Sequence, residues 1–172
     1  MSKILLVILF LHSISLVPKI QAQNSPDSST TIIFVRHAEK LDDNTSNPHL
    51  SEDGLIRAEK LKELLHQKYP VNAIFSTGYH RTQETATPIA EALNIEIVEY
   101  GMNDPANLLQ SILDDYTSQT VLIVGHSNST IILLNTLLGH EKYEWIDEED
   151  FTNIFVVKVS GLGSAEEEHF TY

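Results

Sequence analysis

The sequence predicts an α/β fold: a three-layer sandwich in which a mostly parallel sheet carries helices on both faces. Short runs of β-branched residues alternate along the chain with longer segments whose apolar residues recur at helical spacing. One run, residues 120–124, is continuously apolar, which is typical of a strand buried on both faces of a parallel sheet. No internal repeat or long low-complexity segment interrupts the alternation, so we expect a single domain over residues 31–172.

The expected strands are short runs rich in β-branched residues, at 31–36, 71–76, 95–99, 120–124 and 154–159. The expected helices are segments with a repeating apolar stripe, at 51–69, 82–93, 105–113 and 128–138. Ser51 is the predicted N-cap of the first helix, and Gly139 is placed to end the fourth. Asp104 followed by Pro105 predicts the start of the third. The acidic tail after Gly163 is expected either to add an edge strand or to fray.

The first 22 residues resemble a secretory signal peptide. Lys3 supplies a short basic start, residues 4–11 are almost wholly apolar, and Ala22 is a small residue of the kind that precedes a cleavage site. An uncleaved membrane anchor is the alternative, but the apolar run is short for a membrane span. We therefore expect cleavage after Ala22, a flexible leader at 23–30, and a mature protein that is periplasmic or secreted.

The composition excludes several classes of function. With 24 acidic and 11 basic residues the net charge is −13, so the surface repels nucleic acid and anionic membranes at long range. The absence of cysteine excludes disulfides, thiolate metal sites and cysteine nucleophiles. A site for a small anion remains compatible with this charge, because distant carboxylates are screened within about 10 Å.

Cationic and imidazole side chains follow three of the expected strands at the point where each strand ends. Arg36 and His37 follow the first strand, Arg81 comes after the second, and His126 follows the run at 120–124. The carboxyl ends of parallel strands meet at one edge of a sheet, which is where such sheets bind ligands. Because guanidinium groups bind phosphate in a planar, multidentate manner, these residues predict a phosphate pocket.

Short motifs occur in a fixed order over about residues 31 to 138. They are Arg36-His37, Leu50-Ser51-x-x-Gly54-x-x-Arg57-Ala58, Ser76-Thr77 with Arg81-Thr82-x-x-Thr85-Ala86, and Gly125-His126-Ser127-Asn128. In this order they resemble the histidine phosphatase superfamily, which includes phosphoglycerate mutase-like enzymes and phosphohistidine phosphatases. Ala38 departs from the pattern, since many members carry glycine there, but the change removes no chemical group.

The resemblance implies a phosphoglycerate mutase-like fold and a metal-independent phosphatase acting on phosphomonoesters or phosphoproteins. His37 would attack phosphorus and form a phosphohistidine intermediate, with its second ring nitrogen held by a carbonyl or carboxylate. Arg36 and Arg81 would bind the phosphate oxygens. His126, protonated beside the phosphate, would donate to another oxygen. The short connections after His49 favour a phosphatase with an open pocket over a mutase.

The remaining expected site residues are less firmly marked by motifs. Ser127 and Asn128, at the start of a helix, are expected to add backbone N–H groups to the phosphate site. Many members carry the proton donor as a Glu after the third strand, and others as an Asp after the second histidine, where Ser127 stands here. Glu99, at the end of the third strand, is the candidate donor, with a solvent-facing strand residue as the alternative. Asp104 is better explained as a helix cap.

Two other functions are considered beside the phosphatase. Residues 125–129 resemble the nucleophile elbow of α/β-hydrolases, with Ser127 as nucleophile and Asp147 and His169 downstream. Ser129 replaces the second glycine of that motif, and a serine hydrolase leaves the two arginines unexplained. A phosphate-binding module without turnover would keep the pocket and lack only the proton donor.

No metal or other cofactor is expected. His37 and His126 follow separate strands, and we identify no helical spacing of histidines and carboxylates that would complete a ligand set. The arginines would also repel a cation. Arg57 is interpreted as a residue of the helix surface or its packing, and His80 as either a pocket residue or a solvated loop residue.

Overall fold

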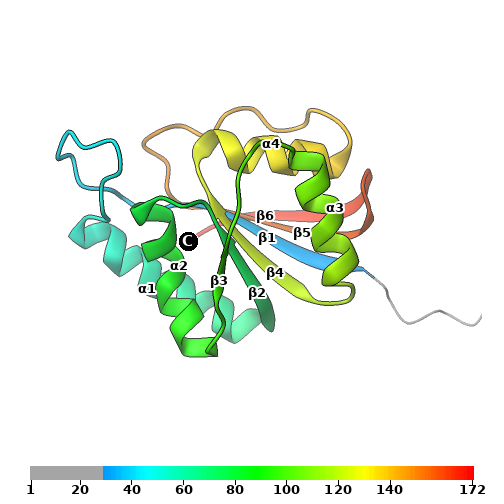
Figure 1. The fold of residues 1–172 in the computed structure, drawn as a ribbon, viewed down its shortest axis with the longest axis horizontal. Coiled ribbons are helices and arrows are strands. Elements are labelled where there is room, and N and C mark those ends of the chain that lie inside the picture. The colour runs from blue at the N-terminus through cyan, green and yellow to red at the C-terminus, as the bar shows by residue number, and fades with distance from the viewer. Residues whose placement is uncertain (1–28) are drawn as a thin grey trace, which may run out of the picture.

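The computed structural model describes residues 29–172, so the predicted signal peptide and nearly all of the predicted leader lie outside the described residues. The elements in chain order are β1 (Thr30–Arg36), α1 (Glu52–Lys68), β2 (Val71–Ser76), α2 (His80–Leu93), β3 (Ile97–Glu99), α3 (Pro105–Asp115), β4 (Thr120–Gly125), α4 (Ser127–Leu138), β5 (Asn153–Gly161) and β6 (Ser164–Thr171) (Figure 1). Thr30, which we assigned to the leader, is the first residue of β1. None of the described helices combines the length and apolar character needed to cross a bilayer.

The six strands form one sheet in the order β3-β2-β4-β1-β5-β6. The first four strands in that order run parallel, while β5 pairs antiparallel with β1 and β6 pairs antiparallel with β5. The predicted α/β fold with a mostly parallel sheet is therefore confirmed. The acidic tail adds an edge strand, because β6 pairs with β5 along nearly its whole length.

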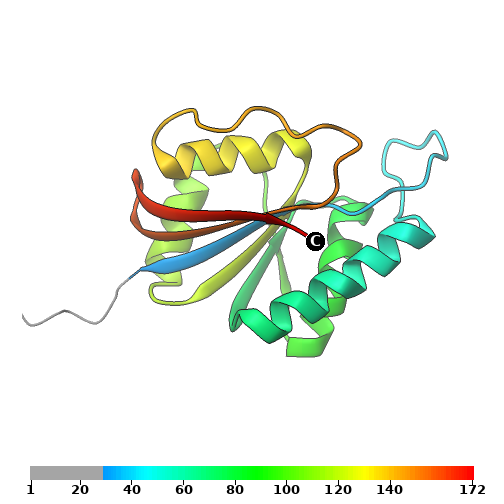
Figure 2. The same cartoon turned by 180° about the vertical axis from the view of Figure 1, so that it is seen from behind.

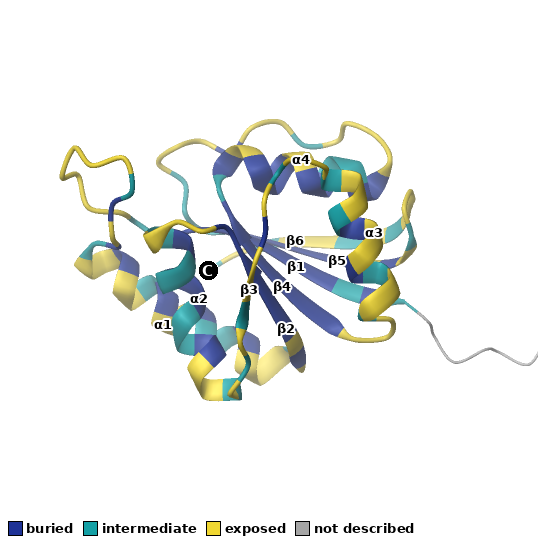
Figure 3. Ribbon diagram, in the orientation of Figure 1, coloured by how far each residue is buried: buried dark blue, intermediate teal, exposed yellow. Residues whose placement is uncertain are grey.

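Helices cover both faces of the sheet, as the two opposite views in Figures 1 and 2 show. Alternate residues of β1 divide between the two cores. Ile32 and Phe34 belong to the core that α3 and α4 cover, whereas Ile33 and Val35 belong to the core that α1 and α2 cover. All four side chains are fully buried, and Figure 3 shows the central strands as the most buried part of the molecule.

The predicted starts of α1 and α3 and the predicted end of α4 are confirmed by their caps, whereas α2 begins two residues earlier than expected. The Ser51 hydroxyl accepts a hydrogen bond from the Gly54 N–H at 3.2 Å, and the Asp104 carboxylate accepts one from the Asn107 N–H at 3.1 Å. Gly139 ends α4 with a φ of 76°, a conformation that favours glycine. The third strand is shorter than expected, because only residues 97–99 pair with β2 at this sheet edge.

The carboxyl ends of β1, β2 and β4 lie side by side and continue to pair just beyond the strands. The His37 N–H donates to the Gly125 carbonyl at 2.8 Å, and the Thr77 N–H donates to the Val124 carbonyl at 3.4 Å. These bonds bring the residue after β1 next to the residue after β4, so His37 and His126 are held close together.

Candidate active site

His37 is buried in the turn that follows β1, with 3% of its surface exposed. Its Nδ1 lies 2.7 Å from the Ala38 carbonyl oxygen. A carbonyl can only accept, so Nδ1 carries the proton of the neutral ring and Nε2 keeps its lone pair. The expected carbonyl partner is therefore present, and it leaves the lone pair of the ring on Nε2.

The surroundings of His37 favour its neutral form. Burial, opposed in part by the hydrogen bond to Ala38, lowers the pKa of His37 to about 3, and the charges of Arg36 and Arg81 lower it further. The imidazole is thus unprotonated at neutral pH. A neutral ring is the form that can attack phosphorus.

Arg36 is 2% exposed and is bound by the acidic segment that precedes β5. Its Nη1 donates to the carbonyl oxygens of Asp147, Glu148 and Asp150, at 2.9, 2.9 and 3.2 Å. Its Nη2 donates to Glu148 Oε2 at 2.9 Å. Nε is buried and has no hydrogen-bond partner. Burial lowers the pKa of Arg36, while the neighbouring carboxylates oppose that shift.

Arg81 lies in the first turn of α2 and presents further unpaired donors. Its Nε and Nη1 are buried without a hydrogen-bond partner, and its guanidinium carbon lies 4.5 Å from the centre of the Tyr79 ring. Burial lowers the pKa of Arg81. Five buried side-chain nitrogen or oxygen atoms in the described chain lack a partner, and three of them belong to Arg36 and Arg81. Buried unpaired donors are costly, so their concentration here indicates a site for an oxyanion.

His126 faces His37 with the ring centres 5.4 Å apart. Arg81 Nη2 donates to His126 Nδ1 at 3.4 Å, so the neutral ring carries its proton on Nε2, which lies 3.0 Å from Thr77 Oγ1. Burial, then the charges of Arg81 and Arg36, lower the pKa of His126 to about 4. The expected protonated His126 would therefore require a negative charge nearby, since an anion raises the pKa of a neighbouring imidazole.

A cavity of about 890 Å³ at this edge of the sheet joins most of the predicted site residues. Its lining includes His37, Arg81, His126, Ser127 and Asn128. The last two form the first turn of α4, as predicted, so the amino end of this helix faces the cavity. Arg36 precedes His37 directly in the chain but is not among the residues that line the cavity.

Glu99 is not part of the cavity lining. It is exposed at the end of β3, and its carboxylate lies over Gly78, 2.7 Å from the position where a Cβ of Gly78 would stand. Gly78 does line the cavity, so Glu99 lies at its rim. Glu148 is the carboxylate that lines the cavity, and it accepts a hydrogen bond from Ser127 Oγ at 2.6 Å.

The residues required for a serine hydrolase do not come together. The Ser127 hydroxyl donates to Glu148 rather than to a histidine. His169 lies on β6, where its Nε2 is 2.7 Å from Asn153 Oδ1 and its ring stacks on Phe155 at 4.3 Å. His169 therefore has no access to the proton of Ser127, and this alternative loses its general base.

One group of side chains in the described chain has the composition of a metal site. The ligand atoms of His49, His80 and Glu84 lie within 4.8 Å of one another, outside the cavity described above. His80 and Glu84 are one turn apart on α2, a spacing that our sequence analysis overlooked. The two imidazole rings stack with their centres 4.2 Å apart, and His49 contacts Glu84. His80 is exposed and does not line the cavity, but it is the first residue of α2 rather than a loop residue, so neither of the two interpretations holds in full.

Several contacts of the site could not be predicted from the sequence. Glu148 lies in an acidic segment that resembles a solvated connection, and only the fold brings it to Arg36 and Ser127. Thr77 is part of a recognised motif, but its contact with His126 is also visible only in three dimensions. Trp145 lines the cavity from the same acidic segment.

Comparison with known proteins identifies the fold. The family model of the histidine phosphatase superfamily (branch 1) matches residues 32–100. The protein histidine phosphatase SixA complexed with tungstate has a TM-score of 0.69 at 16% identity, covering 82% of this chain and 96% of that chain. Phosphoserine phosphatase from Entamoeba histolytica in complex with 3-phosphoglyceric acid has a TM-score of 0.63 at 16% identity, covering 83% and 97%. YhfR from Bacillus stearothermophilus has a TM-score of 0.64 at 17% identity, covering 80% and 94%. No protein with a curated description matches the sequence significantly.

Proposed function

We propose that the chain is a member of the histidine phosphatase superfamily, whose family model matches residues 32–100, and that it is a metal-independent phosphatase that forms a phosphohistidine on His37. The observation that carries this proposal is the state of His37, which feels the charges of Arg36 and Arg81. Its Nδ1 proton is fixed on the Ala38 carbonyl, Nε2 is free, and the neighbouring arginines hold buried donors without partners. A nucleophile and an oxyanion site therefore lie together.

The first step transfers the phosphoryl group to the enzyme. The lone pair of His37 Nε2 attacks phosphorus, and the bond between phosphorus and the ester oxygen breaks. The unpaired donors, Nε of Arg36 and Nε and Nη1 of Arg81, bind the equatorial oxygens. The arriving dianion raises the pKa of His126, which then donates to the phosphate from Nδ1. The departing alkoxide takes a proton from a carboxylic acid, for which we propose Glu99 at the rim of the cavity.

The second step releases inorganic phosphate. Water attacks the phosphohistidine, gives its proton to the carboxylate formed in the first step, and the bond between phosphorus and Nε2 breaks. His37 returns to its neutral form with Nδ1 still bonded to Ala38. Both similar proteins with a named activity are phosphatases, and SixA was solved with tungstate, an oxyanion that resembles phosphate.

The test is a rapid acid-free quench during turnover of 4-nitrophenyl phosphate, followed by analysis of the phosphoenzyme. We expect a phosphoryl group that is stable in base and labile in acid, located on His37 and absent from the His37→Ala variant. Ser127→Ala should retain most of the trapped intermediate, unlike a serine hydrolase. If His37→Ala releases phosphate at the parent rate, the proposal is wrong. Tight binding of vanadate without any turnover would instead identify a phosphate-binding module.

We also propose that the protein is exported, with cleavage after Ala22. The support is the sequence alone: the basic start at Lys3, the apolar run at 4–11 and the small residue at the cleavage site. The measurement is the intact mass of protein recovered outside the cytoplasm. A mature chain beginning at Gln23 supports export, and a chain that retains Met1 and stays with the membrane indicates the anchor.

A further inference from the structure

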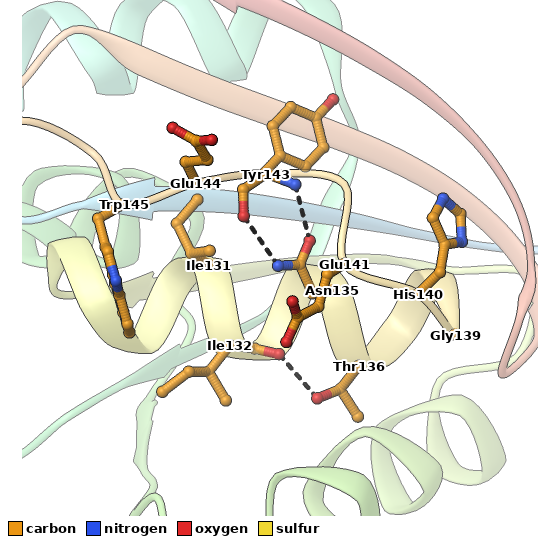
Figure 4. A pocket seen from close by; sticks show the side chains of 10 residues that line it. All are labelled: Ile131, Ile132, Asn135, Thr136, Gly139, His140, Glu141, Tyr143, Glu144 and Trp145. Carbon is orange, nitrogen blue, oxygen red and sulfur yellow. Dashed lines mark hydrogen bonds between the residues drawn. The ribbon is translucent and has the colours of Figure 1, made fainter.

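We propose that the leaving group of the substrate is apolar, carries a positive rather than a negative charge, and lies in a groove along α4. This inference rests on the proposed phosphatase function. The groove is a second cavity of about 770 Å³ between α4 and the segment 139–145 (Figure 4). Its volume is within the range of small-molecule sites.

The groove is continuous with the phosphate pocket. Ile132 and Trp145 line both cavities, so they form the passage from one to the other. A phosphate bound near His37 would therefore direct its ester group toward these two side chains. The geometry makes the groove the natural extension of the active site.

The passage is apolar and open to solvent. Trp145 is 66% exposed, Tyr79 at the phosphate end is 43% exposed, and Ile132 is 39% exposed. Exposed large apolar side chains grouped at a cavity mark a binding surface more often than scattered ones do. Covering them with an apolar leaving group would remove this surface from water.

The groove is held in shape by one side chain. Asn135 on α4 donates from Nδ2 to the Tyr143 carbonyl at 2.9 Å, and its Oδ1 accepts from the Tyr143 N–H at 3.0 Å (Figure 4). The same Oδ1 accepts from the Lys142 N–H at 3.1 Å. The segment opposite α4 is thus fixed to the helix before any ligand arrives. A pre-organised site loses less entropy on binding.

The carboxylates near the groove favour a leaving group with a positive charge. Segment 139–150 contains six acidic residues and one lysine. Glu141 and Glu144 line the groove, whereas Lys142 is paired with Glu167 on β6. Lys40 lines the phosphate end of the first cavity and does not line the groove. A second negative charge on the substrate would therefore meet carboxylates, and a positive charge would be attracted to them and to the face of Trp145.

The kinetic test uses two aryl esters with matched phenols: tyramine phosphate, which is cationic, and the phosphate of 3-(4-hydroxyphenyl)propionate, which is anionic. The matched phenols make the chemical step similar, so a difference in kcat/KM reports binding of the remote charge. We expect about a tenfold preference for the tyramine ester, expressed in KM and reduced by salt. Preference for the anionic ester would overturn the proposal and indicate that Lys40 binds the leaving group.

Variants separate the apolar and the charged contributions. Trp145→Ala should raise KM for both esters about tenfold with little change in kcat. Glu144→Gln should reduce the preference between the two esters. Glu63→Gln, which removes an equal charge from the exposed face of α1, is the matched control and should leave the preference unchanged. No effect of Trp145→Ala or of Glu144→Gln would contradict the groove assignment.

A binding measurement keeps this inference separate from turnover. Trp145 is the single tryptophan of the chain, so its fluorescence reports on the groove directly. We expect a saturable change with benzyltrimethylammonium and a weaker one with phenylacetate, which has the same benzyl group and a negative charge. No saturable change with the cation would overturn the groove. A saturable change without phosphate release from any ester would overturn the proposed function and leave the groove standing.

Discussion

The Arg57 guanidinium binds the carboxylate of Glu39, the second residue after His37. Arg57 Nε lies 2.9 Å from both carboxylate oxygens, and Nη2 lies 2.7 Å from Oε1. The Glu39 carbonyl oxygen accepts from the Ser51 N–H at 2.9 Å. The start of α1 therefore supports the turn that carries His37, and the interpretation of Arg57 as a packing residue is confirmed.

Gly54→Ala should destabilise the fold through this same turn. A Cβ at Gly54 would lie 2.1 Å from the Glu39 carbonyl oxygen, so the backbone would have to shift. We expect the free energy of unfolding to fall by about 1–3 kcal/mol, measured by urea denaturation. Gly161→Ala is the control, because a Cβ there meets nothing within 4 Å. Equal stability of the two variants would contradict the contact.

Arg81→Lys should lower kcat/KM for all phosphate substrates by a similar factor. Lysine keeps the charge but lacks the two unpaired donors, Nε and Nη1, that Arg81 presents. We expect kcat/KM to fall at least about tenfold on alkyl and aryl esters, together with weaker inhibition by vanadate. Arg57→Lys is the comparison, since it removes a similar fork that binds Glu39. Arg57→Lys should lower the free energy of unfolding and leave vanadate affinity nearly unchanged. If Arg57→Lys instead weakened vanadate binding and Arg81→Lys did not, Arg57 rather than Arg81 would be the phosphate ligand.

Glu99→Gln should distinguish substrates by their leaving groups. If Glu99 protonates the departing oxygen, its loss should lower turnover of alkyl phosphates about 10²-fold. Aryl phosphates should lose far less, because phenolate departs without a proton. The measurement is kcat on matched alkyl and aryl esters. Equal losses on both would indicate a positioning role, and no loss on either would remove Glu99 from the mechanism.

Glu148→Gln should strengthen the binding of oxyanions. The Glu148 carboxylate accepts hydrogen bonds from Arg36 Nη2 at 2.9 Å and from Ser127 Oγ at 2.6 Å. Because these contacts hold a negative charge at the cavity, Glu148 should repel an arriving phosphate. We expect a lower inhibition constant for vanadate, with a weaker dependence on salt. Weaker vanadate binding would mean that Glu148 serves mainly to orient Arg36. Loss of turnover confined to alkyl esters would identify Glu148 as the proton donor in place of Glu99.

The two site histidines should make the fold sensitive to mild acid. Their pKa values, about 3 for His37 and about 4 for His126, lie below the ordinary 6.5. Between about pH 6.5 and 4 the unfolded chain therefore binds more protons than the folded one, and stability falls as pH falls. Each histidine contributes up to about 1.4 kcal/mol per pH unit in that window.

Urea denaturation at several pH values, on the parent and on the double variant His37→Asn, His126→Asn, measures this contribution. Asparagine does not titrate, and the carboxylates are common to both proteins. The variant should therefore lose less stability on acidification. Equal slopes for the two proteins would contradict the lowered pKa values.

Local patterns predicted most of the fold and the centre of the site. The strand ends that carry Arg36, His37 and His126 can be predicted because the apolar pattern of a strand and the residues that end it lie within a few positions of one another. The position of Glu148 is not local, since its contacts with Arg36 and Ser127 depend on how a polar connection crosses the sheet edge. The protonation of His126 also follows from burial, which the sequence does not specify.

The contacts of Arg36 with the segment before β5 bear on the order in which the protein assembles. Its carbonyl partners are 111, 112 and 114 residues further along the chain. Closing such a long loop is entropically costly and slow compared with forming a helix. A nascent chain ending before Asp147 would contain His37, Arg81 and His126, yet its Arg36 would lack these acceptors. Competence to bind phosphate should therefore arise late, as the segment from Asp147 onward closes over the first strand.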